Sequence, residues 1–296
     1  ASGIEEVKRK FFGTLFNTYS FFSLYANIDK FKFTGSNFNI EKLDKLDKWI
    51  LSELNTLILN CSKNFDAFEP TKVCRDIQFF VVNKLSNWYV RLSRRKFWKG
   101  EYNESKISAY QTLYECLEKI AIISSPVIPF YSNRLFNDLN KISKRHKIES
   151  VHLASFPNAS LEIINKKLEN QMSIAQEITS MILSLRKQEK IRVRQPLPRA
   201  LVPVNDKLTY ENIMEVKTLI EEETNIKELK VIDEKSGFFV KKIKPNFRIL
   251  GPKYGEKISK VISIINQLDN KNIELLEKNK RLITKENITL LAEDII

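Results

Sequence analysis

Helical periodicity through the first half of the chain is the feature that most restricts how it can fold. Apolar residues recur there at three- and four-residue steps, the spacing that gathers side chains on one face of an α-helix. The predicted helices cover residues 5–26, 40–61, 70–98, 103–120 and 130–140. Because the segments between them are short, we expect an antiparallel bundle of five helices.

Local signals mark where these helices begin and end. Pro70 suits the first turn of the third helix, and Gly100 ends it. Asn103 can cap the fourth helix through its side-chain oxygen.

The pattern changes near residue 158, where we place a domain boundary that separates residues 1–158 from 159–296. Ser160 is predicted to cap a long helix that reaches about Leu185. Prolines and short apolar runs follow, which are typical of strands between helices. The predicted strands are 200–202, 226–232, 238–243 and 288–291, and the predicted helices are 208–223, 254–268 and 274–280. The chain is therefore predicted to be mainly α, with a helical bundle followed by a small α+β domain.

Composition argues against several kinds of active site. Only 7 of 296 residues are glycine, and no glycine-rich phosphate-binding string occurs. The three cysteines and two histidines lack metal-ligand spacing. The acidic runs Asp44/Asp47 and 221–223 look like helix-surface groups without a reason for a shifted pKa. We expect no catalytic residue, no bound metal and no membrane span in this chain, and we expect a cytoplasmic protein.

A net charge of +13 points instead to an anionic partner. The strongest basic cluster is Arg91, Arg94, Arg95 and Lys99, which share one face of the third helix, with Trp88 and Trp98 nearby. Arginine beside aromatic rings suits RNA, because guanidinium groups bind phosphates and rings stack on unpaired bases. A solvated basic face above two core tryptophans is the alternative.

A second basic segment follows the long helix. Arg192 and Arg194 alternate in what we expect to be an extended segment, so both would lie on one side and could bind backbone phosphates. A solvent-facing connector explains the same residues equally well.

Several strings, in order along the chain, resemble the anticodon-binding helical domain of class I aminoacyl-tRNA synthetases, and the later ones resemble the isoleucyl-tRNA synthetases in particular. The strings are Leu46-Asp47-Lys48-Trp49-Ile50-Leu51, Asn87-Trp88-Tyr89-Val90-Arg91, Ser125-Pro126 through Pro129-Phe130, Ser150-Val151-His152-Leu153, Arg194-Gln195-Pro196-Leu197, Pro245-Asn246-Phe247-Arg248 and Leu250-Gly251-Pro252-Lys253-Tyr254-Gly255.

The catalytic signatures of that family, His-Ile-Gly-His and Lys-Met-Ser-Lys-Ser, do not occur. The resemblance therefore implies a C-terminal fragment of an isoleucine-tRNA ligase without its catalytic and editing domains, inactive alone. ATP and Mg²⁺ would belong to the parent enzyme, and no cofactor to this fragment.

The resemblance implies that the partners are isoleucine tRNA and the catalytic domain of the same parent chain, and we expect a monomer. The candidate tRNA-binding residues are Lys8, Arg9, Lys10, Lys30, Phe31, Lys32, Phe33, Arg91, Arg94, Arg95, Lys99, Arg192 and Arg194. The main alternative is a basic helical module that docks on an acidic protein. A DNA-binding protein is less favoured, since no helix-turn-helix spacing or dimer-forming seam occurs.

Overall fold

The structure, a computed structural model, describes residues 2–33, 35, 43–99, 101–233, 243–284, 286 and 288–295. By its internal contacts the chain divides into two compact units, Ala1–Ser180 and Met181–Ile296. The division falls inside a helix, beyond residue 158. The domain boundary that we place at residue 158 stays a prediction.

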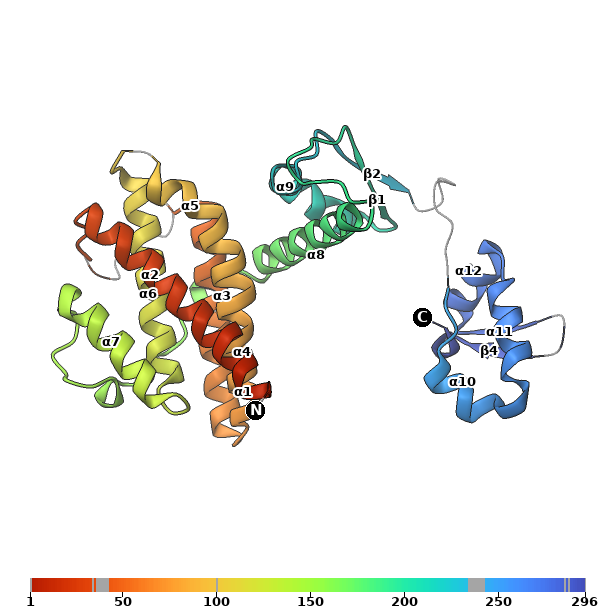
Figure 1. Ribbon diagram of the computed structural model, residues 1–296, viewed down its shortest axis with the longest axis horizontal. Helices are drawn as coiled ribbons and strands as arrows, with labels where there is room; N and C mark the ends of the chain where they lie inside the picture. The colour runs from red at the N-terminus through yellow and green to blue at the C-terminus, as the bar shows by residue number, and fades with distance from the viewer. Residues whose placement is uncertain are drawn as a thin grey trace. The chain divides into compact units, whose positions relative to one another are not determined.

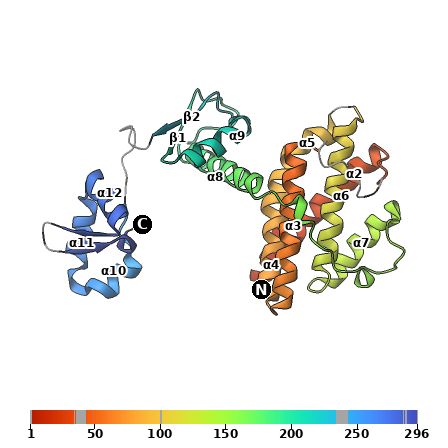
Figure 2. The same ribbon diagram turned by 180° about the vertical axis from the view of Figure 1, so that it is seen from behind.

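Within the described ranges, five helical rods form the bundle of the first unit, as the sequence predicts (Figure 1), and the unit also includes the first part of another helix, α8 (Lys166–Gln188). The first and third rods each contain a π-helical stretch, η1 and η3. The elements are α1 (Ser2–Val7), η1 (Lys8–Phe12), α2 (Gly13–Ile28), α3 (Lys45–Asp66), α4 (Pro70–Phe79), η3 (Phe80–Val90), α5 (Arg91–Trp98), α6 (Glu104–Ser124) and α7 (Pro129–Ser143). Figure 2 shows α3 and α4 side by side from behind.

Two of the predicted helix starts are confirmed, whereas the helix predicted over 40–61 spans Lys45–Asp66 and Gly100 lies outside the described residues. Pro70 occupies the first turn of α4, and the side chain of Asn103 accepts a hydrogen bond from the backbone N–H of Lys106. Helix α3 begins at Lys45 because Asp44 caps it, accepting from the backbone N–H of Asp47 at 2.9 Å.

The core of the bundle lies where α2, α3, η3 and α6 meet. Fully buried side chains come from each of these elements, among them Leu15, Trp49, Tyr89, Leu113 and Leu117. Their burial stabilises the bundle, because each large apolar side chain removed from water contributes about 1.5–3 kcal/mol.

The long helix α8 runs from Lys166 to Gln188, so the predicted start at Ser160 is wrong. Ser160 makes no side-chain cap, and its backbone N–H donates to Oδ1 of Asn55 at 2.8 Å. A single 3₁₀ turn (Leu161–Ile163) follows it. The capping side chain is Asn165, whose Oδ1 accepts from the backbone N–H of Leu168 at 3.0 Å.

The second unit contains the predicted mixture of strands and helices. Strand β1 (Ala200–Val204) pairs in parallel with β2 (Leu229–Asp233), and α9 (Lys207–Thr224) connects them. A parallel pair needs such a crossover, which a helix supplies.

The last part of the chain has a core of its own, made of Leu250, Val261, Ile265, Leu276 and Leu290. Its elements are α10 (Phe247–Tyr254), α11 (Ile258–Asn266), α12 (Asn270–Asn279), and the antiparallel strands β3 (Arg281–Ile283) and β4 (Thr289–Leu291).

A single helix over 254–268 is therefore wrong. Gly255 has a φ of +46°, which ends α10 and starts a new turn before α11. The predicted strand 238–243 lies outside the described residues except for Ile243.

Candidate nucleic-acid interface

The basic face predicted for the third helix lies on α5. Arg91, Arg94, Arg95 and Lys99 are all exposed. The Arg94 guanidinium lies over the ring of Phe21, 5.9 Å from its centroid. In the part of the chain that the structure describes, Arg94, Arg95 and Lys99 form no ion pair with an acidic side chain, so their charges are available to an anionic partner.

Lys96, in the same run, has a different role. Its ammonium contacts Oδ2 of Asp44 and lies 3.9 Å from Oδ2 of Asp47, so it joins α5 to the start of α3. The prediction that Asp44 and Asp47 form an unperturbed surface pair is wrong. Asp47 is only 1% exposed, and burial raises the pKa of its carboxyl to about 6.

The residues that follow α2 pack against the start of α6, where Tyr110 contacts both Phe31 and Phe97 of α5. Asp29 forms an ion pair of 2.6 Å with Lys106 and accepts a 2.6 Å hydrogen bond from the Tyr110 hydroxyl. Burial works to raise the pKa of Asp29, but these contacts outweigh it and the pKa is lowered. The exposed Lys30 and Lys32 follow this anchor, so they lie near the start of α6, which follows α5 in the chain.

Lys8, Arg9 and Lys10 lie elsewhere. They are exposed near the start of the first rod, and Lys10 pairs with Glu6 at 2.5 Å. The rod places them roughly 30 Å from Lys30, at about 1.5 Å per residue. These three cations therefore belong to a different surface from Lys30 and Lys32.

The two predicted aromatic residues after α2 are not exposed platforms. Phe31 is 6% exposed and stacks on Tyr110, with ring centroids 5.0 Å apart. Phe31 is thus a core residue, and its assignment to a tRNA contact is corrected. Phe33 is half-buried. It stacks on Tyr114 at 4.2 Å, and the Arg145 guanidinium lies over its ring at 5.1 Å.

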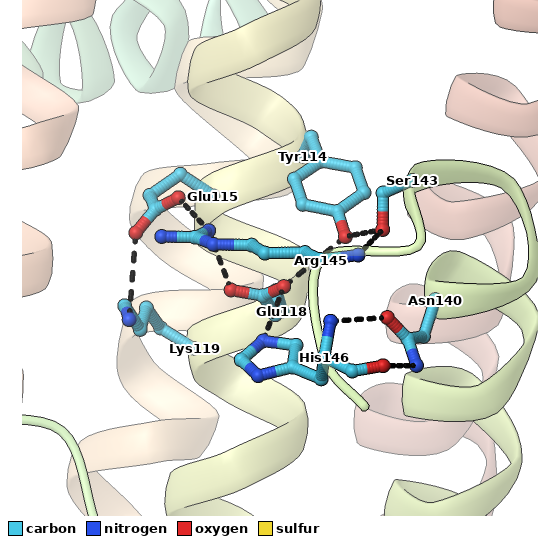
Figure 3. A network of polar contacts seen from close by, with 8 residues as sticks. All are labelled: Tyr114, Glu115, Glu118, Lys119, Asn140, Ser143, Arg145 and His146. Atoms are coloured by element: carbon cyan, nitrogen blue, oxygen red, sulfur yellow. Dashed lines mark hydrogen bonds and ion pairs between the residues drawn. The ribbon is translucent and has the colours of Figure 1, made fainter. Parts of the chain in front are cut away.

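A polar network between α6 and the segment after α7 holds Arg145 in that position (Figure 3). Nη1 of Arg145 donates to Glu115 at 2.6 Å and to Glu118 at 2.7 Å. Glu118 also accepts from the Tyr114 hydroxyl at 3.1 Å and contacts His146 at 3.0 Å. The pKa of Arg145 is raised, because these hydrogen bonds outweigh the opposing effect of burial.

The two tryptophans of the third helix, undecided from sequence, differ in the structure. Trp88 is 8% exposed, whereas Trp98 is 54% exposed with the Lys99 ammonium 5.6 Å from its ring centroid. An exposed ring beside a cation is suited to stacking on a base. The sequence spacing already indicates that Trp98 is exposed. Tyr89, Ser93 and Phe97 recur at four-residue steps and form the buried face of the helix, and Trp98 lies outside that face.

Arg192 and Arg194 lie in a turn, so the predicted extended segment is wrong. The backbone N–H of Gln195 donates to the carbonyl of Arg192 at 3.0 Å and closes the turn. The buried Arg186 holds it by donating to the carbonyls of Arg192 and Gln195. Arg192 and Arg194 remain exposed. Because the backbone turns here, the alternation of side chains along an extended strand does not place them on one side.

Membrane spans and metal clusters are not found among the described residues. No helix in these ranges is both long and apolar enough to cross a bilayer. No group of three or more His, Cys, Asp or Glu side chains in the same ranges could hold a metal ion.

Comparison with known proteins gives a consistent result. A family model described as the anticodon-binding domain of tRNA ligase matches residues 47–201. An isoleucine–tRNA ligase of Cytophaga hutchinsonii is 46% identical over 99% of this chain and 27% of that ligase. Ligases of the same name from Bacteroides fragilis and Porphyromonas gingivalis are 45% and 46% identical, over 99% and 93% of this chain. The chain spans about a quarter of the length of these relatives.

Proposed function

Because the chain belongs to the family of anticodon-binding domains of tRNA ligases, and because its similarity to isoleucine–tRNA ligases covers nearly all of it, we propose that it binds isoleucine tRNA at the anticodon stem and loop. In this proposal it is the tRNA-binding part of a longer ligase, whose catalytic domain joins isoleucine to the tRNA with ATP.

The observation that carries the proposal is the basic end of the bundle. Arg94, Arg95 and Lys99 present charge without acidic partners among the described residues, and the exposed Trp98 lies beside them. Cations that bind phosphates, next to a ring that stacks on a base, are what a loop of single-stranded RNA requires. Lys30 and Lys32 extend this surface.

The other predicted residues have lesser roles in the proposal. Phe33 shapes the surface through its contacts with Tyr114 and Arg145. Lys8, Arg9 and Lys10 would meet a different part of the tRNA, since they lie at the far end of the first rod. Arg192 and Arg194 would provide contacts from the second unit.

ATP and Mg²⁺ enter the proposal only through the parent enzyme. The described residues offer no cluster of metal-binding side chains, and the sequence has no glycine-rich phosphate loop. We assign no residue of this chain to either ligand. The parent ligase would act in the cytoplasm, where tRNA is charged, and we propose a monomer.

A filter-binding assay of the whole chain tests the proposal against its rivals. Isoleucine tRNA and duplex DNA of similar length are titrated at two salt concentrations. We expect tRNA to bind more tightly than DNA and to weaken as salt rises, because binding phosphates releases counterions. A module that docks on acidic proteins would show no preference for tRNA, and tighter binding to duplex DNA would favour a DNA-binding protein.

A further inference from the structure

A pocket of about 360 Å³ lies between α2 and α7, beside the basic end of the bundle. Residues one turn apart along α2 form one wall, Phe33 and Tyr114 form the end, and α7 forms the opposite wall. Its volume is in the range of sites that hold small ligands. Neither the basic face of α5 nor the exposed Trp98 accounts for this pocket.

Aromatic rings make up much of the lining. Tyr19, Phe22, Phe33 and Tyr114 all border the pocket. Phe33 is fixed there by stacking on Tyr114 and by the cation of Arg145, and Arg145 is in turn held by two buried glutamates. The end of the pocket is therefore preformed, and a planar ligand can enter it without first ordering these side chains.

The pocket also offers polar groups suited to the edge of a base. Asn27 lines it and is exposed; its side-chain amide has both a donor and an acceptor. The hydroxyl of Ser23 lies one turn earlier on the same helix and donates only a weak 3.2 Å bond to the carbonyl of Ser20. These groups would pair with a base edge, as buried polar groups of a ligand require.

The charge at the rim is positive. Arg134 and Lys141 line the pocket from α7, and their side chains are 78% and 72% exposed. Both contact one carboxylate, Asp138, at 2.7 and 3.6 Å. Two cations on one anion leave a net positive rim, and the exposed Lys144 follows directly on the chain. A phosphate attached to a bound base would be attracted there.

We propose that this pocket between α2 and α7 receives one unstacked nucleobase of a single-stranded RNA loop, with the flanking phosphate at Arg134 and Lys141. The proposal rests on the proposed function, since it takes the base from the same RNA that the basic end of the bundle binds. Sequence-specific recognition of RNA uses such bases, splayed out of the stack and read at their edges.

The test uses the whole chain and a set of isoleucine anticodon stem-loop RNAs, each with 2-aminopurine at one loop position. Ser23→Leu fills the pocket from the α2 wall. Asn17→Leu is the matched control, because it places the same side chain on an exposed position of α2 that does not line the pocket. Thermal melting establishes that both variants are folded.

We expect Ser23→Leu to weaken binding about tenfold or more, the effect of losing one stacked base. It should also abolish the fluorescence change of the one labelled position that enters the pocket, while Asn17→Leu binds as the unmodified chain does. Unchanged affinity and fluorescence in a folded Ser23→Leu variant would overturn the proposal that the pocket receives a base, and would leave the proposed function intact. Failure of the unmodified chain to bind any stem-loop would overturn both.

A further arm distinguishes the source of the base. Adenosine, cytidine, guanosine and uridine monophosphates are added separately to the bound complex. The pocket is expected to prefer a base carried by the loop, so millimolar free nucleotide should not displace the RNA. Displacement that Ser23→Leu prevents would show that the pocket takes free nucleotides, and would overturn the assignment to an RNA loop.

Discussion

The hydroxyl of Tyr89, near the end of η3, donates a 2.5 Å hydrogen bond to Oδ1 of Asp47 at the start of α3. Both side chains are buried, and Oδ2 of Asp47 has no hydrogen-bond partner. The bond joins η3 to α3 just before α5 begins, so this junction depends on a carboxyl group whose charged form burial disfavours.

This carboxyl should make stability depend on pH. Burial raises the pKa of Asp47 from 3.8 to about 6, so the folded state binds its proton more tightly than the unfolded state does. Its contribution is fully favourable below about pH 4 and is lost as the pH rises through 6, a change of about 3 kcal/mol. Asp47→Asn removes the titration while keeping an acceptor for Tyr89.

Urea unfolding of both proteins at pH 4 and pH 8 measures the effect. The stability of Asp47→Asn relative to the unmodified chain should rise between these pH values by an amount of that order. The comparison cancels the other titrating groups, whose pKa shifts are common to both proteins. A difference that stays constant from pH 4 to pH 8 would show that Asp47 titrates normally.

The network around Arg145 should be important for stability. Glu118→Ala leaves one buried acceptor fewer for Arg145, Tyr114 and His146, and breaking such a buried pair costs about 3–5 kcal/mol. Lys119→Ala is the matched control on the next position, since its 3.5 Å contact with Glu115 is partly exposed and is worth less than about 1 kcal/mol. Equal decreases in unfolding free energy in the two variants would contradict this account.

The sequence predicts the bundle well because its helices are long, periodic and bounded by Pro70 and Asn103. It predicts the basic face of α5 for the same reason, since residues at helical spacing must share a side. The wrong predictions concern residues whose structure is determined by contacts with residues far away in the sequence. Nothing local distinguishes Phe31, which Tyr110 covers, from an exposed ring. Nothing local at Ser160 shows that a 3₁₀ turn follows it and that Asn165 caps the long helix instead.

The second unit shows the same limit. Alternation predicts an extended segment at Arg192 and Arg194, but the side chain of Arg186 bonds to two carbonyls there and stabilises a turn. The break at Gly255 depends on a positive φ. Glycine permits this conformation, but the presence of a glycine in the sequence does not predict it.

Cations on α5 should contribute to affinity for RNA without changing its sequence preference. Arg94→Ala and Arg95→Ala each remove a cation that binds a phosphate, so the slope of log affinity against log salt should fall by about 0.7–0.9 in each variant. Lys72→Ala is a suitable control, because Lys72 is exposed near the start of α4, at the opposite end of the third rod. Slopes unchanged in all three variants would place the bound phosphates elsewhere.

Trp98 should contribute differently. Trp98→Ala removes an exposed ring, so the melting temperature should change little, whereas affinity for the stem-loop should fall by about 1–3 kcal/mol if the ring stacks on a base. Trp98→Phe should restore part of the affinity, and Trp88→Ala should unfold the protein more easily, because Trp88 is only 8% exposed. Full affinity in a folded Trp98→Ala variant would contradict a stacking role.

The most direct measurement is a fluorescence anisotropy titration of the whole chain with two labelled stem-loops that differ only in the three anticodon bases. One carries the isoleucine anticodon, and the other carries an unrelated anticodon on the same stem. The account predicts tighter binding to the isoleucine stem-loop and a steep fall in affinity for both as salt rises. Equal affinity for the two stem-loops, or binding that does not respond to salt, would contradict it.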